Sequence, residues 1–133
     1  MDSLTESMLS VLRAGPPLRL AVLFGSRATT RARVDSDVDL AIIPRDRSFQ
    51  FGDETKLSSA LSKNLRLQID LVRADQASTL LRFRIAREGL VLIAEPAWEW
   101  IRFRATAAAE HAEIADMLER TTKLFRQRPT RRM

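Results

Sequence analysis

Four short apolar runs alternate with stretches of helical periodicity, and this alternation limits the fold more than any other feature of the sequence. The runs span residues 18–24, 38–43, 68–72 and 90–93. Gly25, Pro44 and Gly89 bound three of them, and apolar segments of this length between chain-breaking residues are typical of β-strands. Strands separated by helices predict an α/β (α+β) domain, in which helices pack on a small mixed sheet.

Helical periodicity predicts three helices around these strands. The first begins near residue 3 and ends at Gly15, which two prolines follow. Asp53 is expected to cap the second helix and Asp75 the third, which Gly89 then terminates. The positions expected to face inward are Leu4, Met8, Val11 and Leu12 in the first helix, Leu57, Ala60, Leu61 and Leu65 in the second, and Leu81 and Ile85 in the third.

A fourth, long helix is predicted from Trp98 to about Arg126, because no proline or glycine interrupts this stretch. We divide the chain into a core at residues 1–96 and a C-terminal helix with a basic tail at residues 97–133. One stripe of this helix is expected to pack on the core or on a partner, and it offers a contact for an oligomer. The stripe consists of Trp98, Ile101, Ala105, Ala108, Ala112 and Ala115.

The composition narrows the function classes. The 133 residues carry a formal charge of +5, but tyrosine is absent, and phenylalanine and tryptophan do not alternate with basic residues as in stacking platforms. Direct nucleic-acid binding is therefore not expected. The chain has no cysteine and no apolar run of the roughly 20 residues that cross a membrane, so we expect a cytoplasmic protein. The single histidine, His111, is expected on a helix surface.

Two carboxylates stand at the start of the second predicted strand. Asp37 and Asp39 are two positions apart, and the period of a strand is two, so both side chains leave the same face. Like charges held so close call for a cation between them, and oxygen ligands suit Mg²⁺ or Mn²⁺. Taken alone, the pattern also fits a solvated strand end with capping aspartates.

Two further features flank this pair in the sequence. The first predicted strand leads directly into Gly25 and Ser26, where a glycine backbone and a hydroxyl suit a phosphate. Asp70 interrupts the third apolar run, where an unpaired buried carboxylate would cost several kcal/mol. If this strand neighbours the second, Asp70 can face the same metal or accept a proton. The alternative is an aspartate on an edge strand that points into water.

Together these motifs resemble the nucleotidyltransferase superfamily that includes DNA polymerase β, and more narrowly its minimal nucleotidyltransferases (MNT). The motifs are Gly25-Ser26, Ser36-Asp37-Val38-Asp39-Leu40 and Ile69-Asp70-Leu71-Val72. The likeness spans roughly residues 18–95. One departure bears on turnover: the family usually reads Gly-Ser-x-Ala-Arg-Gly, and here Thr29 and Thr30 replace the arginine and the glycine. A guanidinium that would touch the triphosphate is therefore missing from its usual place, and Arg27, Arg31 and Arg33 are candidates to replace it.

The resemblance implies the nucleotidyltransferase fold and a role for each motif. Asp37 and Asp39 would hold Mg²⁺ or Mn²⁺, and Asp70 would complete the metal site or serve as the base. ATP would be the substrate. The residues that would bind the nucleotide are Gly25, Ser26, Arg27 and Ser36.

The same resemblance points to the antitoxin half of a HEPN–MNT toxin–antitoxin pair. Such a protein would move AMP from ATP to a tyrosine of its toxin, so the expected partner is a HEPN-type toxin. Two alternatives stay open at this point. One is a nucleotidyltransferase that acts on a small molecule, as aminoglycoside-modifying relatives do. The other is a non-catalytic antitoxin that neutralises its partner by binding.

Overall fold

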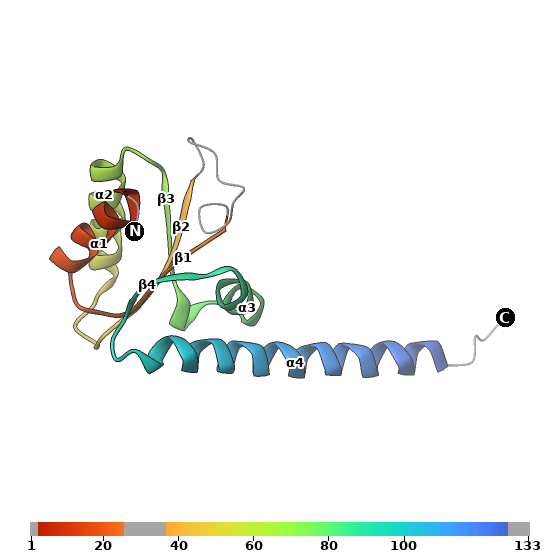
Figure 1. Cartoon of the computed structure of the whole chain (residues 1–133). Helices are drawn as coiled ribbons and strands as arrows, with labels where there is room; N and C mark the ends of the chain where they lie inside the picture. Colours follow the sequence, from red (N-terminus) through yellow and green to blue (C-terminus); the bar gives the residue numbers. More distant parts are fainter. Residues whose placement is uncertain (1–2, 26–36, 128–133) are drawn as a thin grey trace.

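The computed structural model describes residues 3–25 and 37–127 of the chain. The predicted alternation of strands and helices is confirmed, and the domain is a mixed sheet with helices packed on it (Figure 1). A 3-10 helix, η2, is the one element of the described order that the sequence patterns did not predict. In chain order the elements are α1 (Ser3–Ala14), β1 (Leu18–Phe24), β2 (Val38–Pro44), α2 (Phe51–Leu65), β3 (Ile69–Arg73), η2 (Ala74–Gln76), α3 (Thr79–Glu88), β4 (Leu90–Ala94) and α4 (Trp98–Gln127).

The four strands form one mixed sheet in the order β3-β2-β1-β4. Strand β1 runs antiparallel to both β2 and β4, whereas β2 and β3 are parallel. A parallel pair needs a crossover connection, and α2 supplies it between β2 and β3. Because β1 and β2 are antiparallel, the end of β1 lies beside the start of β2, and the start of β3 lies there as well.

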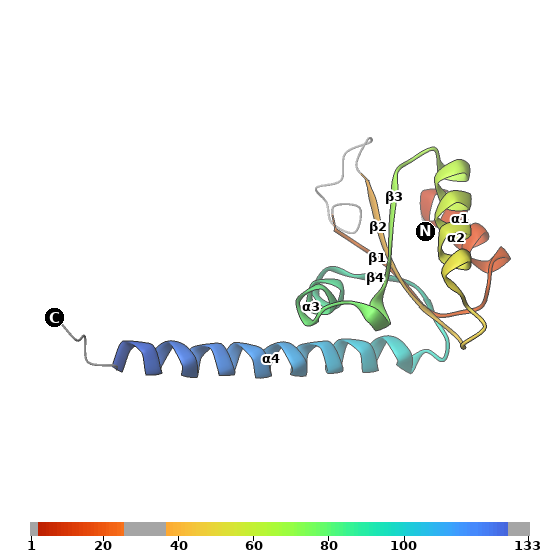
Figure 2. The same cartoon turned by 180° about the vertical axis from the view of Figure 1, so that it is seen from behind.

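Helices cover both faces of the sheet (Figures 1 and 2). On one face, α1 and α2 bury Met8, Leu12 and Leu61 against the sheet. On the other face, α3 and α4 bury Ile85 and Phe103 in a second cluster. Each large apolar side chain that is fully buried contributes roughly 1.5–3 kcal/mol to folding, so the two clusters fix the helices on the sheet.

The structure corrects both predicted helix caps. Helix α2 begins at Phe51, so Asp53 lies in its first turn, where its Oδ2 accepts a hydrogen bond from the Gln50 N–H at 2.9 Å. Asp75 lies in η2 and pairs with Arg73, at 2.7 Å between Oδ2 and Nη2. Ser78 caps α3 instead, because its hydroxyl accepts the Leu81 N–H at 3.2 Å. Neither aspartate is therefore an N-cap residue: Asp53 accepts from the Gln50 backbone, and Asp75 pairs with the Arg73 side chain.

The predicted stripe of α4 does not pack on the core, and its packing on a partner stays a prediction. Trp98 and Ile101 are 53% and 71% exposed, and the alanines of that stripe are exposed too. The helix instead turns Phe103 and Ala107 inward, with Trp100 packed beside them. The bulkier aromatic residues lie on this second face, and burying them removes more apolar surface from water than burying alanines does.

Two polar side chains of α4 share its inward face. Glu99 is buried and pairs with Arg19 of β1 at 3.7 Å, which compensates its charge. His111, expected at the surface, is half-buried and stacks on Phe83, with ring centroids 3.7 Å apart.

In the part of the chain that the structure describes, no helix has the combination of length and apolar character that a membrane crossing requires.

Candidate active site

One end of the sheet brings Gly25, Asp37, Asp39 and Asp70 together. Gly25 directly follows β1, and Asp37 directly precedes β2. Strand pairing places Phe24 opposite Asp39, and Asp39 opposite Asp70. Asp39 and Asp70 are far apart in the sequence, but they are neighbours across two parallel strands.

Asp39 and Asp70 point to the same face of the sheet. Strand period two places Asp39 with Ala41 and Asp70 with Val72, and both apolar residues belong to the cluster beneath α3 and α4. Asp39 is half-buried, whereas Asp37 and Asp70 are exposed. Strand β3 lies at the sheet edge, so Asp70 reaches solvent, as one interpretation of the sequence expected, while it remains beside Asp39.

Gly25 lies directly against the Asp39 carboxylate. Its φ of 74° is in the left-handed region, which residues with a side chain rarely adopt. A Cβ at this position would overlap Asp39 Oδ2 and would lie 3.4 Å from Arg84 Nη2. Glycine is therefore required here twice, for the backbone conformation and for the close approach of the carboxylate.

Arg84 of α3 is a site residue that the sequence patterns did not identify. Its guanidinium lies over the Phe24 ring, 5.4 Å from the centroid, and its Nε donates to Glu88 Oε2 at 3.0 Å. Arg84 precedes the inward-facing Ile85, and no sequence motif at this position indicates a role in binding or catalysis. The one hint was Thr29, which leaves the family's usual arginine unfilled and so makes another guanidinium at this site useful.

The electrostatics of the site favour a cation. Burial raises the pKa of Asp39 above its ordinary value, and the neighbouring Asp70 carboxylate raises it further. Arg84 opposes this change in the Asp39 pKa, while Asp37 and Glu88 add to it. Burial and three neighbouring carboxylates thus disfavour the charge on Asp39, and one guanidinium offsets only part of this effect.

The residues present fit a divalent metal in donor type. Carboxylate oxygens are the ligands that Mg²⁺ prefers, and the repulsion that raises the Asp39 pKa is what a bound cation would relieve. Within residues 3–25 and 37–127, acidic and histidine side chains do not gather in threes as a preassembled metal cluster. Three predicted nucleotide-binding residues, Ser26, Arg27 and Ser36, lie outside the described residues.

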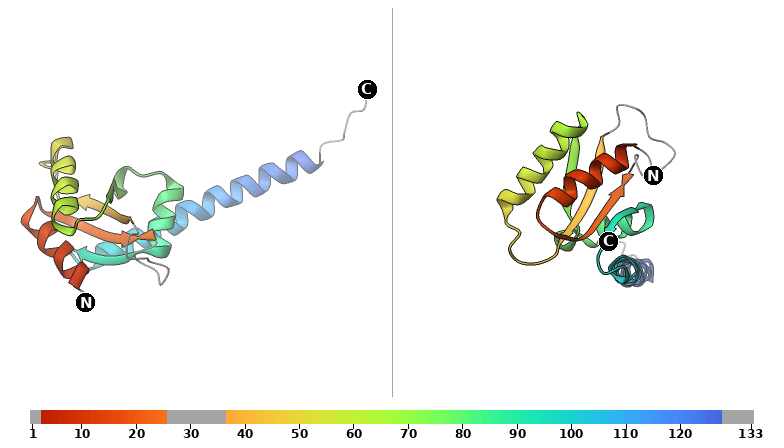
Figure 3. Two further views of the ribbon diagram at one scale, coloured as in Figure 1. Left: turned by 90° about the horizontal axis from the view of Figure 1, so that it is seen from above. Right: turned by 60° about the vertical axis from the view of Figure 1, so that its left-hand side comes forward.

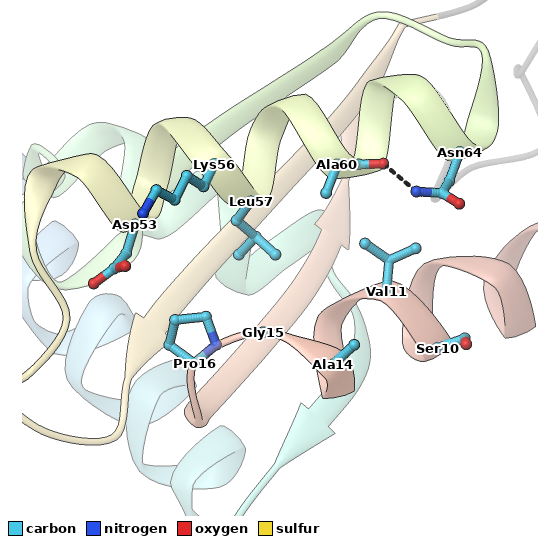
Figure 4. Close-up of a pocket in the computed structure, with 10 residues that line it drawn as sticks. All are labelled: Ser10, Val11, Ala14, Gly15, Pro16, Asp53, Lys56, Leu57, Ala60 and Asn64. Carbon is cyan, nitrogen blue, oxygen red and sulfur yellow. Dashed lines mark hydrogen bonds between the residues drawn. The ribbon is translucent and has the colours of Figure 1, made fainter.

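A cavity of about 480 Å³ lies far from these carboxylates, between α1 and α2 (Figure 4). Val11 and Leu57 extend toward each other across it, and Asp53 and Lys56 lie along one side (Figure 4). It opens beside Gly15, which precedes β1, whereas the carboxylates lie where β1 ends. The cavity is therefore separate from the candidate active site.

Comparisons with known proteins identify the family of this chain. A family model described as "Polymerase beta, Nucleotidyltransferase" matches residues 6–96, which include Gly25 and all three aspartates. The chain is also 30% identical, over 120 residues, to the protein adenylyltransferase MntA of Aphanizomenon flos-aquae (strain 2012/KM1/D3). That likeness covers 84% of this chain and 80% of the relative.

Two solved structures show the same fold. A crystal structure of a toxin–antitoxin with AMP-PNP has a TM-score of 0.76 and 23% identity, over 91% of this chain and 98% of the other. A structure of the tri-AMPylated Shewanella oneidensis HEPN toxin in complex with MNT antitoxin has a TM-score of 0.69 and 22% identity, over 92% and 96%. The protein is a nucleotidyltransferase, and the chain belongs to the minimal nucleotidyltransferases of the polymerase β nucleotidyltransferase family.

Proposed function

We propose that the protein is an antitoxin that transfers AMP from ATP to a hydroxyl of a HEPN-type toxin in the cytoplasm. The observation that carries the proposal is the Asp39–Asp70 pair, held in register across β2 and β3, with the Asp39 carboxylate directly against Gly25. Support for the acceptor comes from the relative named a protein adenylyltransferase and from the solved complex of an AMPylated HEPN toxin with an MNT antitoxin.

Each residue of the site has a part in this transfer. Gly25, together with Ser26 and Arg27, would receive the triphosphate, because a glycine backbone allows phosphate oxygens to approach. Asp37 and Asp39 would hold Mg²⁺, which when bound neutralises charge on the reacting phosphate. The residues that would bind the nucleotide or the metal are Gly25, Ser26, Arg27, Ser36, Asp37, Asp39 and Asp70.

In this proposal the exposed Asp70 would act as the base. The acceptor oxygen forms a bond to the α-phosphorus, the bond from that phosphorus to the bridging oxygen breaks, and pyrophosphate leaves. The acceptor proton passes to the Asp70 carboxylate, which is open to solvent and therefore to an incoming protein. Positioning the reactants and neutralising their charge supply most of the rate enhancement.

One alternative has an observation of its own. Thr29 and Thr30 replace the arginine and glycine of the family motif, which favours an antitoxin that acts by binding alone. Arg84 weighs against this alternative, because it brings a guanidinium to the same end of the sheet. A small-molecule acceptor has no comparable observation in its favour.

A labelling experiment tests the proposal. The protein is incubated with α-labelled ATP, Mg²⁺ and a HEPN-type toxin. We expect label on the HEPN protein and loss of its toxicity, and both should disappear with Asp37→Asn. If the wild-type protein transfers no label and Asp37→Asn still neutralises the partner, the proposed transfer is wrong and the binding-only antitoxin is correct.

The pH dependence of transfer should report the Asp39 carboxylate. Metal binding needs Asp39 ionised, and its pKa is raised, so kcat/KM should fall on the acid side at a pH above the ordinary value for an aspartate. Because Arg84 lowers this pKa, Arg84→Ala should move the acid limb to higher pH. The measurement is a pH profile of label transfer for both proteins at one fixed, subsaturating Mg²⁺ concentration.

Arg87→Ala is the matched control for this profile. Arg87 lies on the same helix, over the Phe83 ring, and does not influence the Asp39 pKa. Its acid limb should coincide with that of the wild type. An acid limb that stays in place, or moves to lower pH, in Arg84→Ala would show that Arg84 does not act on this carboxylate.

A further inference from the structure

The inward face of α4 continues as an apolar seam beyond the body of the protein. Phe103 and Ala107 pack on the body, and the same three- and four-residue spacing leads onward to Ile114 and Leu118. The side chains of this distal part are 38% to 65% exposed. We call Ile114, Met117, Leu118 and Leu124 the distal seam.

The opposite face of the same segment is charged. Asp116 pairs with Arg120, and Glu119 pairs with Lys123 at 3.6 Å, each four residues apart along the helix. These pairs satisfy one another in water and contribute a few tenths of a kcal/mol each to helix stability. The segment is therefore amphipathic, with a face suited to solvent and a distal seam suited to protein.

The direction of α4 relates the distal seam to the candidate active site. The helix runs along the body and projects past the end of the sheet to which β1 leads (Figures 1 and 3). That end carries Gly25 and the three aspartates. A protein bound to the projecting half of α4 is therefore held on the side of the molecule where the carboxylates lie.

We propose that the distal seam is the docking surface for the acceptor protein, which covers it with an apolar helical surface of its own. This inference rests on the proposed function and names the surface through which the partner is recognised. A ridge of apolar residues at three- and four-residue spacing is the shape that fits a groove on another helix. The seam itself carries no charge, so its complement is apolar rather than acidic or basic.

The extent of the seam favours a larger partner over a second copy of this chain. Residues 114–124 span about 15 Å at 1.5 Å per residue, and a helix is about 10 Å wide, so two paired seams would cover roughly 150 Å² on each copy. Stable interfaces cover about 800 Å² per partner. An acceptor protein that contacts both the projecting helix and the catalytic end of the body reaches that area, whereas self-pairing of the helices does not.

Docking on α4 would also explain how a small site selects its acceptor. A partner tethered beside the carboxylates presents its hydroxyl at a high effective concentration, so transfer becomes nearly intramolecular. The active site then needs to recognise only ATP and a hydroxyl. Specificity for one protein lies in the distal seam, some distance from the chemistry.

Charged substitutions on the two faces of α4 test this proposal. The seam variant carries Leu118→Glu and Leu124→Glu, and the control carries Ala109→Glu and Ala112→Glu, which add the same charge on the exposed opposite face. We expect the seam variant to bind a HEPN-type toxin ~100-fold more weakly than the wild type does, because buried anchors dominate such interfaces. The control should bind as the wild type does, by calorimetry or surface immobilisation.

Additional measurements separate the possible failures. Circular dichroism should show equal helix content in both variants, since neither pair lies in the core. Wild-type protein that binds but transfers no label would refute the transfer and leave the docking surface intact. Equal binding by the seam variant and the wild type would overturn the docking surface. So would equal weakening by the control, or a wild-type dimer that the seam variant dissociates without loss of toxin binding.

Discussion

Replacing Asp39 with asparagine should reduce AMP transfer by ~10³-fold or more and, at neutral pH, make the fold more stable. Transfer falls because asparagine supplies one neutral oxygen where the metal and the reacting phosphate need a negative charge. Labelled ATP with the HEPN partner measures this loss. Asp116→Asn is the matched control, since it makes the same change on the charged face of α4 and should leave transfer unchanged.

The gain in stability follows from the raised pKa of Asp39. A carboxyl whose pKa is higher in the folded state binds its proton more tightly there, so folding is favoured at low pH and loses this stabilisation as the pH rises through the folded pKa. Asparagine does not titrate and avoids the loss. The melting temperature of Asp39→Asn should therefore exceed that of the wild type at pH 7, and the difference should shrink as the pH falls toward 3.8.

Mg²⁺ should reverse this order. A ligand that binds the folded state raises the melting temperature of a protein that can hold it. Millimolar Mg²⁺ with ATP should therefore stabilise the wild type, whereas Asp39→Asn should gain little. If the variant melts below the wild type at pH 7 without metal, burial and the neighbouring carboxylates do not disfavour the charge on Asp39, and this account of the site is wrong.

Much of this end of the sheet could be predicted because strand geometry is simple. The period of two places Asp37 and Asp39 on one face without any knowledge of the tertiary structure. The position of Asp70 beside Asp39 could not be predicted in this way, because it depends on which strand lies beside β2. The register of Asp39 with Asp70 is a fact of topology, set by the crossover through α2, and no local pattern in the sequence contains it.

The inward face of α4 was not predictable from periodicity alone. The helix carries two apolar stripes about half a turn apart, and each follows the three- and four-residue spacing. Alanines made the stripe through Ala105 the more regular of the two. The other stripe packs on the sheet, because Phe103 offers more apolar surface to bury. The predicted stripe is exposed to solvent. Bulk, rather than regularity, decided the packing.

Arg84 and the helix caps were also not predictable from local sequence patterns. The start of α2 lies two residues before the predicted cap, so Asp53 meets the Gln50 N–H from within the first turn. A shift this small turns a cap into part of a capping box. Arg84 approaches Gly25 only because α3 packs across the end of β1, and that packing is a long-range contact.

Gly25→Ala should disable the site at a larger cost to function than to folding. The left-handed φ costs a residue with a side chain roughly 1–2 kcal/mol, and the new Cβ occupies the place of Asp39 Oδ2. The carboxylate must therefore leave its position against the loop. We expect a loss of transfer of about 10²–10³-fold, as when a group that stabilises the transition state is displaced, and a lower melting temperature.

A second substitution and a matched glycine separate the two effects. Asparagine tolerates positive φ better than alanine but brings the same Cβ, so Gly25→Asn should melt higher than Gly25→Ala and remain as inactive. Gly52→Ala is the control: it lies in α2 with no atom within 4 Å of an added Cβ, and alanine there should keep full transfer and raise stability by up to about 1 kcal/mol. If Gly25→Asn recovers transfer, backbone strain and not the displacement of Asp39 disables Gly25→Ala. If all three variants transfer AMP normally, the contact between Gly25 and Asp39 has no part in the chemistry.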